Sequence, residues 1–148
     1  MKLMFRMSVL LLVCIFSFSN CVEADNDKPI AVGDLPAAAQ TLIVEHFGDK
    51  EVALAKVESG LVEKNYDVVF TDGTKLEFNR KGEWTEVDCR KESVPSGLIP
   101  TAIAQYMKST YPNAQIVKIE KEHKEWEVKL GTGIEITFNK KFEVIDID

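Results

Sequence analysis

The hydrophobic pattern along this chain switches twice from helical spacing to strict alternation. Apolar residues three and four positions apart run from Leu35 to Phe47 and again from Ile99 to Tyr111. Each run begins beside a proline, which is tolerated there because the first turn of a helix needs no amide donor. After each run, apolar and polar residues alternate, as in strands with one packed and one wet face. The pattern predicts two amphipathic helices, each followed by strands.

The second half of the chain repeats the first. Tyr66–Phe70 matches Trp126–Leu130 at a spacing of 60 residues, and the hairpin glycines Gly73 and Gly133 keep the same spacing. Each copy is predicted to run helix, strand, strand, strand, strand, and two copies side by side bury each other's sheet edges. The predicted fold class is α+β, with two tandem helix-plus-antiparallel-sheet repeats that form one extended sheet with the helices on one face.

The first residues are typical of a secretion signal. Lys2 and Arg6 precede an apolar run over residues 7–18 that is too short to span a bilayer. We expect cleavage near Ala24 and a periplasmic product, with a lipoprotein anchored at Cys21 as the alternative. The predicted boundaries are a signal peptide at 1–24, an N-terminal tether at 25–33, repeat 1 at 34–89, a linker at 90–97 and repeat 2 at 98–148.

Charge and composition disfavour several function classes. The net charge of −6 gives no electrostatic basis for binding nucleic acid. Cys14 and Cys21 lie in or beside the signal, so Cys89 is interpreted as a buried or half-buried structural thiol rather than a redox or catalytic group. His46 and His123 are too few and too far apart to indicate a metal site. Because no nucleophile motif or phosphate loop occurs either, we expect no enzyme activity and no cofactor.

Alternation along the strands also predicts which residues face water on the sheet. If Val87 points toward the helices, strand parity turns Trp84 away from them, whereas Trp126 falls in the core. An exposed tryptophan among charges is typical of a protein interface. The alternative is that Trp84 folds over the sheet edge or fills the groove between the repeats. The residues predicted to share the open face with Trp84 are Leu54, Val69, Lys75, Glu77 and Glu86.

The paired helix starts, the Asp67–Phe70 and Glu127–Leu130 strands, and the Lys75–Asn79 segment resemble the PepSY-like, beta-lactamase-inhibitor-like periplasmic proteins. The resemblance covers nearly all of residues 25–148. It implies a tandem α+β fold with an open face that grips a protein partner, and a hairpin acidic residue that enters an enzyme's pocket. Asp72, at the tip of the first hairpin, is the one position that corresponds.

We therefore expect a non-enzymatic exported binding module that recognises a protein or peptide in the periplasm through its open sheet face, with Trp84 at its centre. Inhibition of a hydrolase, either a peptidase or a beta-lactamase, through the Asp72 hairpin is the alternative. A metal- or small-ligand-binding envelope protein is the third, and a weak homodimer through the sheet edges stays open.

Overall fold

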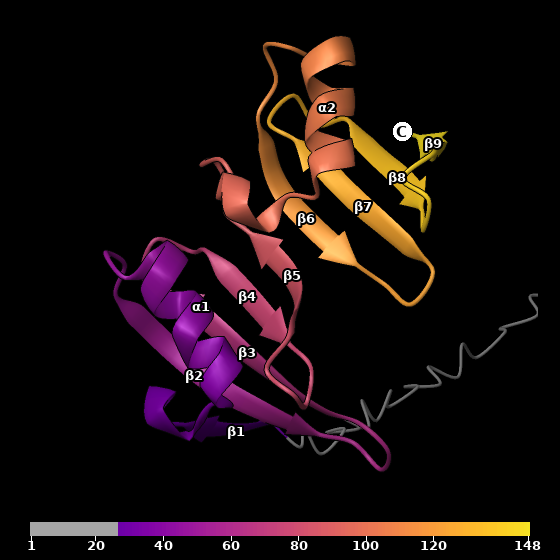
Figure 1. The fold of residues 1–148 in the computed structure, drawn as a ribbon. Coiled ribbons are helices and arrows are strands. Elements are labelled where there is room, and N and C mark those ends of the chain that lie inside the picture. Colours follow the sequence, from indigo (N-terminus) through magenta and orange to yellow (C-terminus); the bar gives the residue numbers. More distant parts are fainter. Residues whose placement is uncertain (1–26) are drawn as a thin grey trace, which may run out of the picture.

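The structure is a computed structural model that describes residues 27–148 (Figure 1). The predicted signal peptide, its cleavage site near Ala24 and the alternative anchor at Cys21 lie outside these residues. In chain order the elements are β1 (Asp27–Ile30), η1 (Val32–Asp34), α1 (Ala37–Phe47), β2 (Val52–Ser59), β3 (Lys64–Phe70), β4 (Lys75–Phe78), β5 (Trp84–Asp88), η2 (Ser96–Leu98), α2 (Thr101–Thr110), β6 (Ile116–Lys121), β7 (Glu125–Leu130), β8 (Glu135–Asn139) and β9 (Val144–Ile147).

The described strands form a single antiparallel sheet in which each strand pairs with the next strand of the chain, from β1 to β9. Both α-helices cover the same face of this sheet, α1 over its first part and α2 over its second (Figure 1). This arrangement confirms the predicted α+β class and the extended antiparallel sheet with helices on one side.

The expectation of an unstructured tether at 25–33 is wrong for its described part. Residues Asp27–Ile30 form β1, which pairs with β2 in a register that sets Pro29 opposite Lys56. Proline cannot donate to a sheet ladder, so it is confined to edge strands, and β1 is the first edge of this sheet. The polar composition of Asp27–Ile30 gives no strand pattern, because this segment becomes a strand only by pairing with the edge of β2.

The helices bury one face each against the sheet. In α1, Ile43 and Phe47 are buried, and the Phe47 ring stacks on Phe70 of β3 at 5.6 Å between centroids. On the opposite half, Tyr106 of α2 meets Phe138 of β8 edge to face at 5.3 Å. These contacts fasten each helix to strands that follow it in sequence.

The helix side of the sheet carries an unbroken row of apolar side chains, one on each strand from β2 to β8. Register places them directly opposite one another on neighbouring strands, and those from β2 to β8 are buried. Val87 and Ile119 form the link between β5 and β6, where the two halves of the sheet meet. The row consists of Ala55, Val68, Leu76, Val87, Ile119, Val128 and Ile136.

Four of the strand pairs contain a register shift, and those in β4–β5 and β8–β9 lie at corresponding places in the two halves. Between β4 and β5, Glu77 pairs with Glu86 but Phe78 pairs with Trp84, which leaves Thr85 as an extra residue. Between β8 and β9, Phe138 pairs with Val144 and leaves Ile145 extra. Such bulges reverse the alternation of side chains beyond them.

Phe78→Ala and Phe138→Ala test whether both halves contribute to one core. Each ring is fully buried at a corresponding strand position. We expect each substitution to lower the free energy of unfolding by about 3–5 kcal/mol, from lost apolar burial plus a cavity. Urea denaturation followed by circular dichroism measures this. Val44→Ala on the exposed side of α1 is the control, and a loss confined to one variant contradicts the expectation.

Candidate functional site

The open face of the sheet, opposite the helices, carries a row of acidic side chains across five neighbouring strands. Register sets each carboxylate beside the next, from β3 through β4, β5 and β6 to β7. Like charges directly opposite one another on paired strands destabilise a sheet. The row consists of Asp67, Glu77, Glu86, Glu120 and Glu127.

Three lysines of the same face partly neutralise this acidic row. The Lys118 ammonium lies 3.1 Å from Glu86 and 3.2 Å from Glu120, bridging the two halves of the sheet. Lys56 and Lys75 lie 3.4 Å and 3.7 Å from the Asp67 carboxylate. The open face is thus a lattice of internal ion pairs.

Burial raises the pKa of several carboxyl groups in the acidic row. For Asp67 and Glu86, loss of water is the main cause, and neighbouring lysines oppose it. For Glu127, burial again raises the pKa, and the Glu120 carboxylate opposite adds to the effect. The acidic row therefore costs the fold some stability at neutral pH.

The open face holds five of the residues predicted for it. Leu54 pairs with Val69, Val69 with Lys75, and Glu77 with Glu86, all on the side away from the helices. Their role in binding stays a prediction.

The predicted position of Trp84 on the open face is wrong. Because Thr85 is an extra residue in the ladder, Trp84 pairs with Phe78 and shares its helix-facing side. Strict alternation from Val87 cannot reveal such a bulge, since it assumes one residue per step. The alternative, that Trp84 fills the groove between the repeats, describes its position better.

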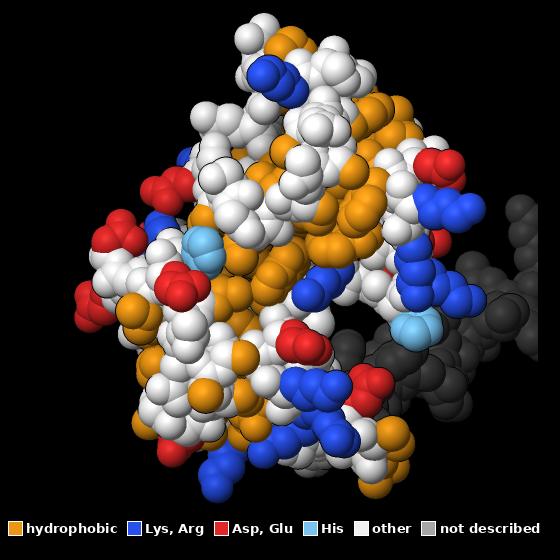
Figure 2. Space-filling view, viewed as in Figure 1, with side chains coloured by type: hydrophobic (Ala, Val, Ile, Leu, Met, Phe, Trp, Pro, Cys, Tyr) orange, Lys and Arg blue, Asp and Glu red, His pale blue; other side chains and the backbone are white. Residues whose placement is uncertain are grey.

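Trp84 belongs to an aromatic seam, defined here as Trp84, Trp126, Phe142 and Lys121. The Trp84 and Trp126 rings meet edge to face at 5.9 Å, and the Trp126 and Phe142 rings lie 5.8 Å apart. All three rings are half-buried against the core. Figure 2 shows hydrophobic side chains gathered on this side of the molecule between α1 and α2.

Lys121 adds a cation to the seam. Its ammonium lies 4.5 Å from the centre of the Trp84 ring, a cation–π geometry. Partial burial lowers the Lys121 pKa, and the Glu83 carboxylate opposes this shift. The seam therefore offers apolar rings beside a partly desolvated charge.

Phe142 occupies a backbone conformation that disfavours its side chain. Its φ angle is +61°, in the left-handed region, where a bulky residue is strained. Gly82, 60 positions earlier, has φ +81° at the corresponding turn. Both turns are closed by an asparagine whose side-chain oxygen accepts from backbone N–H groups, Asn79 in one and Asn139 in the other. The second turn thus places a ring on Trp126 where the first has glycine.

Asp72 lies at the tip of the β3–β4 hairpin, as predicted, but its carboxylate is engaged. It forms an ion pair with Lys50, which also binds Glu92 at 2.7 Å, and it accepts a hydrogen bond from the Thr74 backbone N–H at 2.8 Å. The hydrogen bond from Lys50 lowers the pKa of Asp72 to about 2. The aspartate ties the hairpin to the loop after α1.

Cys89 is buried at the end of β5, as the sequence indicated. Burial raises the pKa of its thiol to about 11. A protonated thiol is a poor nucleophile and a poor metal ligand. This environment agrees with a packing role.

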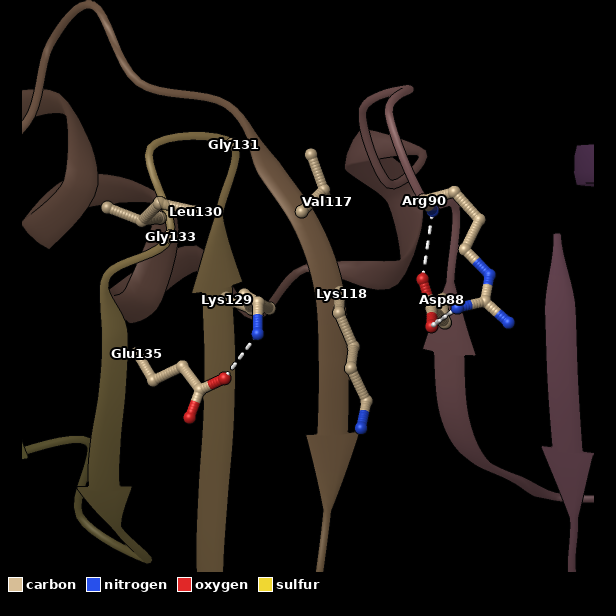
Figure 3. A pocket seen from close by; sticks show the side chains of 9 residues that line it. All are labelled: Asp88, Arg90, Val117, Lys118, Lys129, Leu130, Gly131, Gly133 and Glu135. Atoms are coloured by element: carbon tan, nitrogen blue, oxygen red, sulfur yellow. Dashed lines mark hydrogen bonds and ion pairs between the residues drawn. The ribbon is translucent and has the colours of Figure 1, made fainter. Parts of the chain in front are cut away.

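A shallow cavity of about 350 Å³ opens at one end of the sheet, across β5, β6, β7 and β8 (Figure 3). Four of its charged residues pair with one another, Lys129 with Glu135 at 2.6 Å and Arg90 with Asp88 at 3.5 Å, whereas Lys118 pairs with Glu86 and Glu120 outside the cavity. Cysteine, serine and histidine are missing from its lining. The cavity offers no nucleophile next to a base.

Within residues 27–148, no group of three or more His, Cys, Asp or Glu side chains is arranged to hold a metal ion. Over the same residues, no helix has the length and apolar character needed to cross a membrane.

Comparison with known proteins gives the family of the chain. Residues 64–146 match the family described as "Putative beta-lactamase-inhibitor-like, PepSY-like", and this match spans more than half of the chain. The chain belongs to the PepSY-like family. No protein with a curated description matches it.

Solved structures of PepSY-like relatives support the fold. A Bacteroides vulgatus protein, described as a "putative periplasmic protein" of the DUF2874 family, shares 52% identity with a TM-score of 0.82, covering 84% of this chain and 98% of that one. A Bacteroides thetaiotaomicron protein, described as a "putative calcium-regulated periplasmic protein", shares 51% identity with a TM-score of 0.81 and the same coverage. A second Bacteroides vulgatus protein shares 42% identity, with a TM-score of 0.78, 82% of this chain and 98% of that one.

Sequence reasoning missed the aromatic seam. The signal in the sequence was Phe142, which stands 60 positions after Gly82 in the corresponding turn. In the structure both residues have a positive φ angle. A bulky residue replacing a turn glycine is unfavourable in itself and indicates a gain elsewhere.

Glu127→Gln tests the cost of the acidic row. The folded-state pKa is raised above the ordinary value of 4.5, so the penalty is present at neutral pH and disappears as pH falls through that raised pKa. We expect the substitution to stabilise the protein by about 0.2–1 kcal/mol at neutral pH. Urea denaturation at neutral pH and near about pH 4 measures this, and the gain should shrink at the lower pH. The control Glu45→Gln, at an exposed position of α1, should change neither, and an equal gain there contradicts the assignment.

Proposed function

We propose that this PepSY-like protein is a non-enzymatic, exported binding module that recognises a protein or peptide partner. Sequence reasoning assigned this role to the open sheet face with Trp84 as anchor. Because Trp84 lies in the aromatic seam, the geometry favours the seam as the main contact surface, with the open face as a second surface.

The observation that carries the proposal is the strained conformation of Phe142. A left-handed backbone costs a non-glycine residue about 1–2 kcal/mol, and the first half avoids this cost with Gly82. The ring gained in return is only half-buried, so core packing alone is a weak reason to keep it. Strain of this kind clusters at binding sites.

The composition of the seam fits protein recognition. Tryptophan and other aromatic side chains dominate the energetic centres of protein interfaces. Here two tryptophans and Phe142 are held by mutual contacts, so they lose little side-chain freedom on binding. Lys121 beside them suits a partner with a carboxylate or a carbonyl oxygen at the apolar contact.

The open face supports a different kind of contact. The acidic row lies on the side of the sheet away from the helices, but its carboxylates already form ion pairs with Lys56, Lys75 and Lys118. A partner there must replace existing ion pairs, which offsets much of the gain. We therefore propose the aromatic seam, rather than the open face, as the main contact surface.

Substitutions in the seam should weaken partner binding more than they weaken the fold. We expect Phe142→Gly to keep the free energy of unfolding within about 1 kcal/mol of wild type, because relief of backbone strain offsets lost packing. Binding should fall about thirtyfold or more for Trp84→Ala, the loss typical of an interface hot spot. Affinity purification of the tagged protein from its native envelope identifies the partner, and titration then measures each variant.

Matched variants separate the two surfaces and the strain. Phe142→Ala lacks the ring but keeps the strain, so it should be less stable than Phe142→Gly and equally poor in binding. Glu77→Gln with Glu86→Gln changes only the open face. If this pair abolishes binding while Phe142→Gly does not, the seam is the wrong surface.

Inhibition of a hydrolase is the second candidate, favoured by the family's description as beta-lactamase-inhibitor-like. The position of Asp72 at a hairpin tip fits it, but its ion pair with Lys50 must open first. We expect that Lys50→Ala strengthens any inhibition, because it frees the carboxylate. Titration against exported peptidases and beta-lactamases checks this, with Asp72→Asn as control. Absence of inhibition by both wild type and Lys50→Ala rules it out.

The calcium regulation named for the Bacteroides thetaiotaomicron relative applies to that protein. We include calcium in the titrations because the acidic row gathers carboxylates on one face, although no three of the described Asp and Glu side chains are arranged to hold a metal ion. If calcium raises the melting temperature of wild type and of Glu127→Gln equally, the acidic row is not where calcium acts.

A further inference from the structure

The β2–β3 hairpin ends in two aliphatic residues with nothing covering them. Leu61 and Val62 have exposed fractions of 107% and 90%, the highest among the large hydrophobic side chains of the described residues. The Gly60 N–H donates to the Glu63 carbonyl oxygen at 2.8 Å, so these two residues form the centre of a tight turn. Turn centres normally hold glycine, asparagine, aspartate or proline.

This hairpin projects beyond its neighbours. β2 and β3 contain eight and seven residues, whereas β4 contains four. Figure 1 shows the β2–β3 hairpin reaching past the other strands at one end of the sheet, and Figure 2 shows hydrophobic side chains at that apex. The two aliphatic side chains can therefore reach a flat surface before the rest of the molecule does.

Basic residues surround the apex on a chain of negative net charge. Arg80, from the β4–β5 turn, lines the same hollow as Leu61 and Val62, and His123 lies beside Val62. Lys64 and Lys81 are exposed nearby in the hairpin and in that turn. The carboxylate in the same hollow is Glu63.

The chain enters the described fold at this same end. Asp27, the first described residue, pairs with Glu58, one residue before the end of β2. An acyl chain at Cys21, the alternative that the sequence leaves open, would lie at most about 20 Å of extended chain from Asp27. The apex and Asp27 therefore lie at the same end of the sheet.

We propose that the apex of the β2–β3 hairpin inserts Leu61 and Val62 into the surface of an anionic phospholipid bilayer. Arg80, Lys64 and Lys81 would then meet the lipid phosphates. Short aliphatic insertions combined with basic residues give reversible membrane binding, which becomes stable with a second anchor. A protein pocket fits the apex less well, because two side chains on a narrow turn offer far less area than a stable protein interface buries.

Flotation with lipid vesicles tests this proposal, which is independent of the proposed function. The protein from Asp25 onward is suitable, because crystal structures of relatives are covered to 98% by 84% of this chain. Wild type should float with vesicles of phosphatidylethanolamine and phosphatidylglycerol, less with pure phosphatidylcholine, and less at high salt. Leu61→Asp with Val62→Asp should reduce the bound fraction about tenfold or more.

Two controls keep the result specific. Val44→Asp introduces the same charge at an aliphatic residue that is 73% exposed on α1, and it should float like wild type. Arg80→Ala with Lys81→Ala should reduce binding to the anionic vesicles and weaken its dependence on salt. Unchanged melting temperatures show that the variants are folded. Wild type that does not float with any vesicle, or an apex variant that floats like wild type, overturns the proposal.

Discussion

The pairing of β5 with β6 is the contact on which the rest of this structure depends. Val87 meets Ile119 on the helix side, and Glu86 meets Glu120 on the other, where Lys118 holds the two carboxylates together. This one ladder joins the strands under α1 to the strands under α2. Without it, β5 and β6 would each present unpaired backbone N–H and C=O groups at a sheet edge, a known route to aggregation.

The two sides of the continuous sheet are specialised differently. The helix side buries the apolar row and leaves the aromatic seam half-covered between α1 and α2. The opposite side places carboxylates beside one another and relieves them with lysines. Rings held rigid by mutual contacts, as in the seam, are typical of surfaces that recognise proteins.

Most of the architecture could be predicted from periodicity, because amphipathic helices and alternating strands leave clear patterns. The helix starts, the hairpin at Asp72 and the burial of Cys89 followed from local rules. The face of the sheet on which Trp84 lies could not be predicted. One extra residue in β5, Thr85, reverses the direction in which the side chains beyond it point, without changing the composition. β1 was missed for a different reason: a polar segment with a proline becomes a strand only when a neighbouring edge accepts it.

Spatial order equals chain order in this sheet, from β1 to β9. Most strands therefore pair with the strand just before them through a short turn, whereas β1–β2 and β5–β6 pair across connections that contain α1 and α2. Proteins dominated by such near-neighbour contacts fold quickly for their class. The polypeptide can consequently assemble progressively from its beginning, adding one strand at a time as it emerges, with β1 as the fixed edge and the newest strand as the growing edge.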